Sequence, residues 1–245
     1  MTKLRKYASH VKALFVLLLG AWTLVSCQAD QGPPPKVVVV FVDVSASVKD
    51  FEGYHDSWKK IVDRLTAGDR VLLGRITDET FTQFRPVIDE SLPTFSWISD
   101  NSRDYDKKLK QTKERLSKAI DGSLKAPRSQ KTDILNTLAL ADKIFHSDKR
   151  RAVLLLLSDM LEDSEVYNFE KLKVDQTFAR RIIEEKHRKG ELPDLKGAKI
   201  YVAGASAKNA SKALEIQRFW LEYVKAANGN LAAEHYGPAL INFDE

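Results

Sequence analysis

The sequence predicts a doubly wound α/β domain with a mostly parallel sheet and one antiparallel edge strand. Three near-continuous apolar runs, rich in β-branched residues, stand far apart in the chain, at Lys36–Asp43, Arg151–Ser158 and Ala198–Gly204. Such runs are typical of strands that are buried on both faces. Segments with apolar residues at helical spacing lie between them. This alternation of strands and helices favours parallel strands joined by helical crossovers.

Four helices follow from the spacing of apolar residues, at Phe51–Leu65, Asp133–Phe145, Thr177–Lys189 and Asn209–Ala227. In the first of them, Trp58, Ile61 and Val62 fall on one helical face. Asn228-Gly229 follows the last helix and fits a C-terminal cap. The segment at about 91–121 is less regular and then helical, and we interpret it as an insertion.

An early hairpin is predicted where two strand-like runs lie close together. Arg70–Thr77 and Phe81–Ile88 are separated by only three residues, which is too short for a helical crossover. The second run is therefore expected to be antiparallel, and Pro86 suits a position on the sheet edge. A final strand is expected at Ala239–Phe243, with Leu231–His235 as the alternative.

Residues 1–26 have the pattern of a secretory signal peptide: a basic start without acidic residues, then the short apolar run Ala13–Leu19. The run is too short to cross a bilayer comfortably. The ending Leu24-Val-Ser-Cys27 resembles the lipobox of bacterial lipoproteins, in which the cysteine is acylated and becomes the new N-terminus. Cys27 is the only cysteine of the chain. An ordinary signal peptide with an incidental cysteine and an uncleaved signal anchor are the alternatives.

After the signal, a polar and proline-rich tether is expected at 27–35, and one domain with a single core at 36–245. Gln28 follows the cysteine, which resembles the outer-membrane sorting pattern and implies a periplasm-facing location in a Gram-negative source. Four of the 39 basic residues lie in the signal, so 35 basic against 34 acidic residues leave a net charge of about +1. This near-balance gives no reason to expect nucleic acid as a partner.

Oxygen-bearing side chains gather at the expected carboxyl ends of the central strands. Asp43 ends the first strand and Ser45 and Ser47 come after it, Asp159 follows the second strand, and Thr132 precedes a helix. In open α/β sheets ligands bind beyond the carboxyl ends of the strands. A set of only oxygen donors suits a hard cation, Mg²⁺ or Mn²⁺, and the absence of His and Cys from the set argues against zinc.

In this order and on these elements, the five residues resemble the metal-ion-dependent adhesion site (MIDAS) of a von Willebrand factor A (vWA) domain. The resemblance extends over nearly the whole mature chain and implies the Rossmann-like fold of that family. It also implies Ser45, Ser47 and Thr132 as metal ligands, with Asp43 and Asp159 as direct or water-bridged ligands. An acidic residue of a protein partner would complete the shell. The chain is thus expected to be a non-catalytic binding or scaffolding module on a bacterial membrane.

Other interpretations of the same residues stay open. Ser45, Ser47 and Asp159 are also residues that cap helices, and a degenerate site would fold without binding metal. A metal-dependent phosphohydrolase can also carry Asp43 at this position, but usually needs a second Asp two residues later as general acid, where this chain has Ser45. No glycine-rich phosphate loop is present either. A metal-free structural lipoprotein is the third possibility.

The segment Lys107–Lys131 has nine basic residues against Glu114 and Asp121. Because its end adjoins Thr132, a positive field there could steer an acidic partner or a lipid headgroup towards the metal. A solvated helix face is the simpler interpretation and is favoured.

Overall fold

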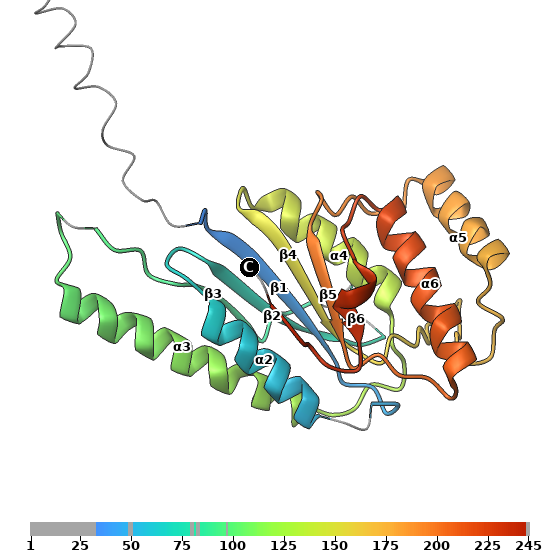
Figure 1. Cartoon of the computed structure of the whole chain (residues 1–245), viewed down its shortest axis with the longest axis horizontal. Helices are drawn as coiled ribbons and strands as arrows, with labels where there is room; N and C mark the ends of the chain where they lie inside the picture. Colours follow the sequence, from blue (N-terminus) through green and yellow to red (C-terminus); the bar gives the residue numbers. More distant parts are fainter. Residues whose placement is uncertain (1–32, 49–50, 79–80, 82–83, 97, 244–245) are drawn as a thin grey trace, which may run out of the picture. The chain divides into compact units, whose positions relative to one another are not determined.

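The computed structural model describes residues 33–48, 51–78, 81, 84–96 and 98–243 (Figure 1). They form a six-stranded sheet in the order β3-β2-β1-β4-β5-β6. The strand β3 is antiparallel to β2, and all other neighbours are parallel. The predicted fold class is therefore confirmed. The strands are β1 (Lys36–Asp43), β2 (Arg70–Ile76), β3 (Ile88–Ser91), β4 (Arg151–Leu157), β5 (Lys199–Ala203) and β6 (Tyr236–Gly237).

Helices cover both faces of the sheet because β1 directs alternate apolar residues to opposite sides. Val37, Val39 and Phe41 pack into the core beneath α4, α5 and α6, whereas Val38 and Val40 pack into the core beneath α2 and α3. All four predicted helices are confirmed to within two residues at each end. The helices are α2 (Glu52–Arg64), α3 (Ser102–Leu124), α4 (Ile134–Ser147), α5 (Gln176–Lys189), α6 (Ala210–Ala226) and the 3₁₀ turn η1 (Ala233–His235).

The segment predicted as an insertion at about 91–121 contains most of α3, which is amphipathic. Its residues Leu116 and Ile120 are buried in the core shared with α2. The Trp58 indole of α2 donates a 2.8 Å hydrogen bond to the Leu116 carbonyl. Asn101 caps the helix by accepting a hydrogen bond from the Arg103 N–H. The helix is thus an integral part of the cover on this face of the sheet.

The location predicted for the antiparallel strand is wrong, although its direction is right. The strand lies at Ile88–Ser91 instead of Phe81–Ile88. Pro86 has no N–H to donate, and pairing with β2 begins only after it. Phe84 instead packs its ring edge-on against Phe41, with 5.9 Å between the ring centroids. Its apolar side chain therefore serves the core without belonging to the sheet.

Both positions expected for the last strand are also wrong. The segment Leu231–His235 ends in the 3₁₀ turn, and Ala239–Phe243 forms no strand. The sheet ends in the two-residue strand β6, which pairs with β5 in parallel. Leu240 and Phe243 are nevertheless buried against the core under α2 and α3. Their apolar character reflects packing on the sheet rather than pairing within it.

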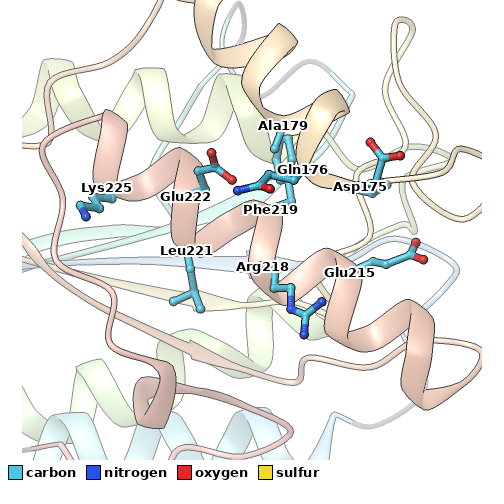
Figure 2. Close-up of a pocket in the computed structure, with 10 residues that line it drawn as sticks. Asp175, Gln176, Ala179, Glu215, Arg218, Phe219, Leu221, Glu222 and Lys225 are labelled. Atoms are coloured by element: carbon cyan, nitrogen blue, oxygen red, sulfur yellow. The ribbon is translucent and has the colours of Figure 1, made fainter.

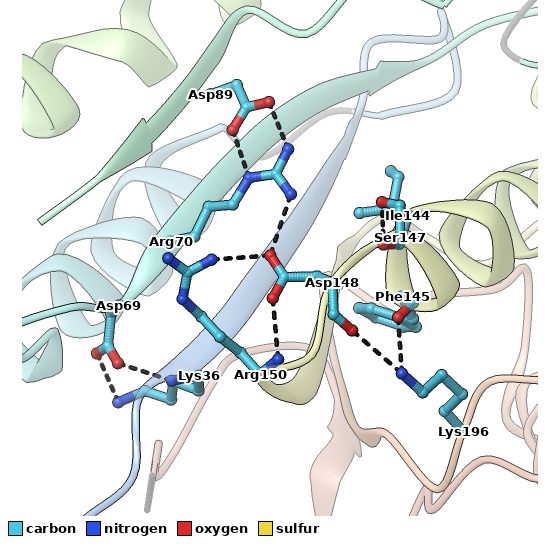
Figure 3. Close-up of polar contacts among 10 residues, drawn as sticks. All are labelled: Lys36, Asp69, Arg70, Asp89, Ile144, Phe145, Ser147, Asp148, Arg150 and Lys196. Carbon is cyan, nitrogen blue, oxygen red and sulfur yellow. Dashed lines mark hydrogen bonds and ion pairs between the residues drawn. The ribbon is translucent and has the colours of Figure 1, made fainter.

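Ion pairs lie at the end of the sheet where the central strand β1 begins (Figure 3). The buried Lys36 ammonium lies 2.8 Å from the buried Asp69 carboxylate, which also accepts the Lys36 N–H. Arg70 bridges Asp89 and Asp148. Because a buried charge is costly when unpaired, the Lys36–Asp69 pair fixes the start of β1 against the start of β2.

The predicted signal peptide, Cys27 and most of the tether lie outside the described residues, so these features stay predictions. The compact unit that contains the sheet begins at Pro35. Among the described residues, no helix combines the length and the apolar character needed to cross a bilayer.

Candidate metal site

The site begins where the adjacent strands β1 and β4 end. Their register pairs Val42 with Leu157, so the next residues, Asp43 and Ser158, lie side by side at the rim of the sheet. The Ser158 hydroxyl donates a 2.8 Å hydrogen bond to Oδ2 of Asp43, whose side chain is fully buried. The register of two apolar strands thus positions a carboxylate at the carboxyl edge.

A short turn after β1 brings the two serines back towards Asp43. The Ser45 N–H donates to Oδ1 of Asp43 over 2.8 Å, and the hydroxyls of Ser45 and Ser47 lie 2.8 Å apart. Ser45 is buried, whereas Ser47 is exposed. Since both carboxylate oxygens of Asp43 already accept hydrogen bonds, Asp43 is suited to hold a water ligand of a metal ion.

Asp159 supplies the second carboxylate, one residue after Ser158. Burial raises the pKa of Asp159 to about 6, and the charge of Asp43 adds to the increase. Hydrogen bonds from the Leu161 N–H and the nearby Ser47 hydroxyl act in the opposite direction. Burial also raises the pKa of Asp43. Two buried carboxylates, both with raised pKa values, form a place where a cation would be stabilising.

Thr132 is held beside this cluster by its backbone. Thr132 and Asp163 exchange two N–H to carbonyl hydrogen bonds of 2.9 Å. Ser129, in the same loop, exchanges backbone hydrogen bonds with the turn after β1, to Val44 and Ala46. The Thr132 hydroxyl makes no hydrogen bond within the described part of the chain. The structure therefore brings Asp43, Ser45, Ser47 and Asp159 together and places Thr132 in the adjoining loop.

The donor chemistry fits a hard divalent cation. The cluster has two carboxylates, and hydroxyl groups provide the other oxygens, which suits an ion such as Mg²⁺ that keeps part of its water shell. Over the residues that the structure describes, no group of three or more His, Cys, Asp or Glu side chains is arranged to hold a metal. A metal site built on carboxylates or imidazoles alone is thus not found there.

Three supporting residues were not assigned to the site from the sequence, and Arg128 and Ser158 are the first two. Arg128 donates from Nη1 to the carbonyls of Ser45 and Val48, at 2.8 and 3.0 Å, and lies 4.2 Å above the ring of Phe51. It fixes the turn after β1, and its charge lowers the pKa of Asp43. In the sequence Arg128 belongs to the basic segment 107–131, which gives no indication of this contact. Ser158 directly precedes Asp159 in the sequence, and this position at the end of a strand could have indicated that it supports the site.

Glu162 is the third supporting residue. Its buried carboxylate accepts hydrogen bonds from the N–H groups of Ile134 and Leu135, at 2.8 and 3.1 Å. These two N–H groups belong to the first turn of α4, which begins two residues after Thr132, so Glu162 caps the start of this helix. Burial, followed by the charge of Asp133, raises the pKa of Glu162 to about 8. No local pattern predicts this long-range cap.

Backbone geometry next to the cluster is unusual. Met160, which follows Asp159, is in the left-handed region with φ 66° and is held by the Ser158 hydroxyl and the Trp220 indole. Gly204, at the end of β5, has φ 103°, and a Cβ there would lie 2.5 Å from the Tyr54 ring. Strained positions of this kind often occur at functional sites.

A cleft of about 680 Å³ adjoins the cluster, with Ser47 and Asp159 in its wall together with Tyr54, Gly204 and Lys208. A second cavity, of about 810 Å³, lies between α5 and α6 around Phe219 (Figure 2). None of the five predicted site residues lines the second cavity. Of these two cavities among the described residues, the first adjoins the candidate metal site and could admit a ligand to it.

The chain is similar to several solved structures, three of which are described here. One is a von Willebrand factor type A structure from Catenulispora acidiphila, 17% identical, covering 81% of this chain and 38% of that chain, with a TM-score of 0.46. The open form of the pilus adhesin SpaC from Lactobacillus rhamnosus GG is 14% identical, covering 84% and 29%, with a TM-score of 0.47. The manganese-loaded TRAP protein of Plasmodium vivax is 12% identical, covering 76% and 63%, with a TM-score of 0.37.

This chain spans less than two thirds of the length of each of these three. No protein-family model matches the sequence, and neither does any curated protein.

Proposed function

We propose that this domain binds Mg²⁺ or Mn²⁺ through Asp43, Ser45, Ser47, Thr132 and Asp159, and uses the ion to bind an acidic group of a protein partner. One observation carries the proposal: two buried carboxylates and two hydroxyls meet where β1 and β4 end. The burial of these carboxylates is unfavourable without a cation and becomes favourable with one.

Each side chain has a distinct part in this proposal. The hydroxyls of Ser45, Ser47 and Thr132 would hold the ion, and Asp159 would bind it directly or through water. Asp43, whose oxygens accept from Ser45 and Ser158, would orient a water ligand. A bound divalent ion would supply the positive charge that attracts a partner carboxylate. The chain itself contributes the rigid placement of these oxygens, and no step of catalysis is required.

We also propose that Cys27 is lipidated and anchors the chain in the bacterial cell envelope, at the periplasmic side of the outer membrane if the source is Gram-negative. The lipobox-like sequence that ends at Cys27 supports this part of the proposal. Mass spectrometry of the mature chain tests it, because diacylglycerol and acyl groups on Cys27 add a defined mass. A mature chain with an unmodified cysteine would contradict the proposal.

Calorimetric titration with Mg²⁺ and Mn²⁺ tests the metal site. Ser45→Ala/Ser47→Ala should abolish saturable binding, because it removes two hydroxyl ligands. The control Ser117→Ala/Ser211→Ala changes two exposed serines on α3 and α6 and should leave binding intact. A folded wild-type chain that binds neither ion, or equal binding by both variants, would overturn the proposed site.

Two further assays separate the alternatives. Mg²⁺-dependent hydrolysis of a phosphate ester that is lost in Asp43→Asn would establish a phosphohydrolase and overturn the non-catalytic role. Partner capture that is unchanged by a chelator would establish a metal-free scaffold. The proposal expects no turnover, and partner binding that is lost with the chelator.

A further inference from the structure

The tether enters the domain beside an exposed loop, residues 92–101, that joins β3 to α3. Pro35 and Thr94 both pack against Gly68: a Cβ built there would lie 3.1 Å from the first and 3.2 Å from the second. The Gly68 N–H also donates to the Leu92 carbonyl. The 92–101 loop therefore lies beside Pro35, the first residue of the domain.

This loop exposes large apolar side chains. Ile98 is 78% exposed and Phe95 is 47% exposed. Phe95 packs edge-on against Tyr105 of α3, with 5.2 Å between the ring centroids, so the loop is supported by the helix. Transfer of such side chains from water into an apolar phase is favourable.

We propose that the 92–101 loop is a membrane contact, with Phe95 and Ile98 inserting into the interface of the phospholipid bilayer that holds Cys27. This inference rests on the proposed lipidation of Cys27. The eight peptide units between Cys27 and Pro35 can span at most about 29 Å. A patch kept this close to the bilayer has an effective concentration on the order of millimolar, so weak insertion is sufficient.

The charges around the loop agree with insertion driven mainly by apolar contact. Between residues 100 and 110, the exposed side chains include four basic and three acidic groups, so the local net charge is close to zero. The basic groups on the first turns of α3 can contact headgroup phosphates, but the acidic groups offset most of that attraction. A bilayer interface accepts this combination, because it offers apolar chains below a polar layer.

Membrane seating would also orient the metal site. The loop lies at the edge where β1 begins, and the Asp43 cluster lies where β1 ends (Figure 1). The eight residues of β1 span about 26 Å. A domain seated on the 92–101 loop therefore directs the metal cluster away from the anchoring membrane, towards a partner.

A fluorescent probe at Ile98 tests the contact in the full acylated chain. Ile98→Cys is labelled with an environment-sensitive dye in vesicles of phosphatidylethanolamine and phosphatidylglycerol, and acylated Cys27 offers no competing thiol. Val166→Cys is the matched control, because Val166 is 72% exposed and lies outside the loop. Lipids with a quencher in the acyl chain should quench the probe at 98 about threefold more than the probe at 166. Equal quenching at both positions would overturn the inference.

Membrane retention separates the failure of this inference from the failure of the anchor. A chain that stays with the vesicles while the probe at 98 remains in water overturns only the loop contact. A chain that is released from the vesicles and carries no acyl group overturns both. In Phe95→Ser/Ile98→Ser, we expect the chain to stay anchored and the quenching of a dye at Thr94→Cys to fall to the level at 166.

Discussion

Replacing Asp159 with asparagine should stabilise the metal-free domain at neutral pH. Burial and the charge of Asp43 raise the pKa of Asp159 to about 6, from an ordinary value of 3.8. Ionisation of this carboxylate therefore destabilises the folded state. Asparagine carries no charge and keeps an oxygen that can accept the Leu161 N–H. The variant removes the penalty and preserves the local hydrogen bond.

The size and direction of the effect follow from the two pKa values. Because the pKa of Asp159 is higher in the folded state than in the unfolded state, its protonation stabilises the fold. This stabilisation is complete below about pH 4 and is lost as pH rises from 3.8 through 6. The difference of about two pKa units corresponds to roughly 3 kcal/mol. At pH 7.5, the free energy of unfolding of Asp159→Asn should therefore be up to about 3 kcal/mol higher than that of wild type. At pH 4 the two free energies should be equal.

Urea unfolding in a chelator, at pH 4 and pH 7.5, measures this difference. Asp175→Asn is the control of opposite sign, because hydrogen bonding from the Phe178 N–H lowers the pKa of Asp175, so this variant should be less stable than wild type at pH 7.5. Mg²⁺ at about a hundredfold excess over its Kd should stabilise wild type and Asp175→Asn by about 2.7 kcal/mol, and should not stabilise Asp159→Asn. If metal-free Asp159→Asn is no more stable than wild type at pH 7.5, the burial argument for the site is refuted.

Three further predictions concern the supports of the site and the sheet. The Tm of Glu162→Gln, measured relative to wild type, should rise between pH 4 and pH 9. The protonated Glu162 carboxyl stabilises the wild-type fold, and this contribution is lost as pH rises from 4.5 through about 8. Asp69→Asn leaves the buried Lys36 without its counter-charge and should lower the unfolding free energy in urea by about 3–5 kcal/mol. Gly204→Ala introduces a contact of 2.5 Å with Tyr54 and a strained φ, so its Tm should fall by several degrees, consistent with a cost of about 1–3 kcal/mol.

The central strands could be predicted from the sequence because their burial is two-sided. β1 and β4 are continuous apolar runs, and each residue on either face meets a helix-covered core. The edge strands lack this signature. The residues of β3, Ile88–Ser91, include two acids and a serine, and β6 has only two residues. Their pairing depends on which chain segment reaches an already formed sheet edge, and no local pattern encodes that.

The site divides in the same way. Asp43 and Asp159 could be placed together, because Asp43 ends β1 and Asp159 lies two residues after the end of β4, and parallel neighbours end at one rim. Arg128 and Glu162 could not, since each reaches its partners across a long sequence separation. Their contribution depends on the path of the loops, which the periodicity of apolar residues does not determine.

The contacts around the cluster indicate what a bound cation would contribute energetically. Arg128 already fixes the turn that contains Ser45, and the backbone of Thr132 is paired with Asp163 on both sides. Little conformational entropy is therefore left to lose when an ion binds. The unfavourable element of the metal-free site is the burial of the Asp159 carboxylate, to which the charge of Asp43 adds, and both raise the pKa of Asp159. Ion binding should thus compensate buried negative charge within a preformed site rather than order a loop, and it should release protons below about pH 6, where Asp159 is protonated.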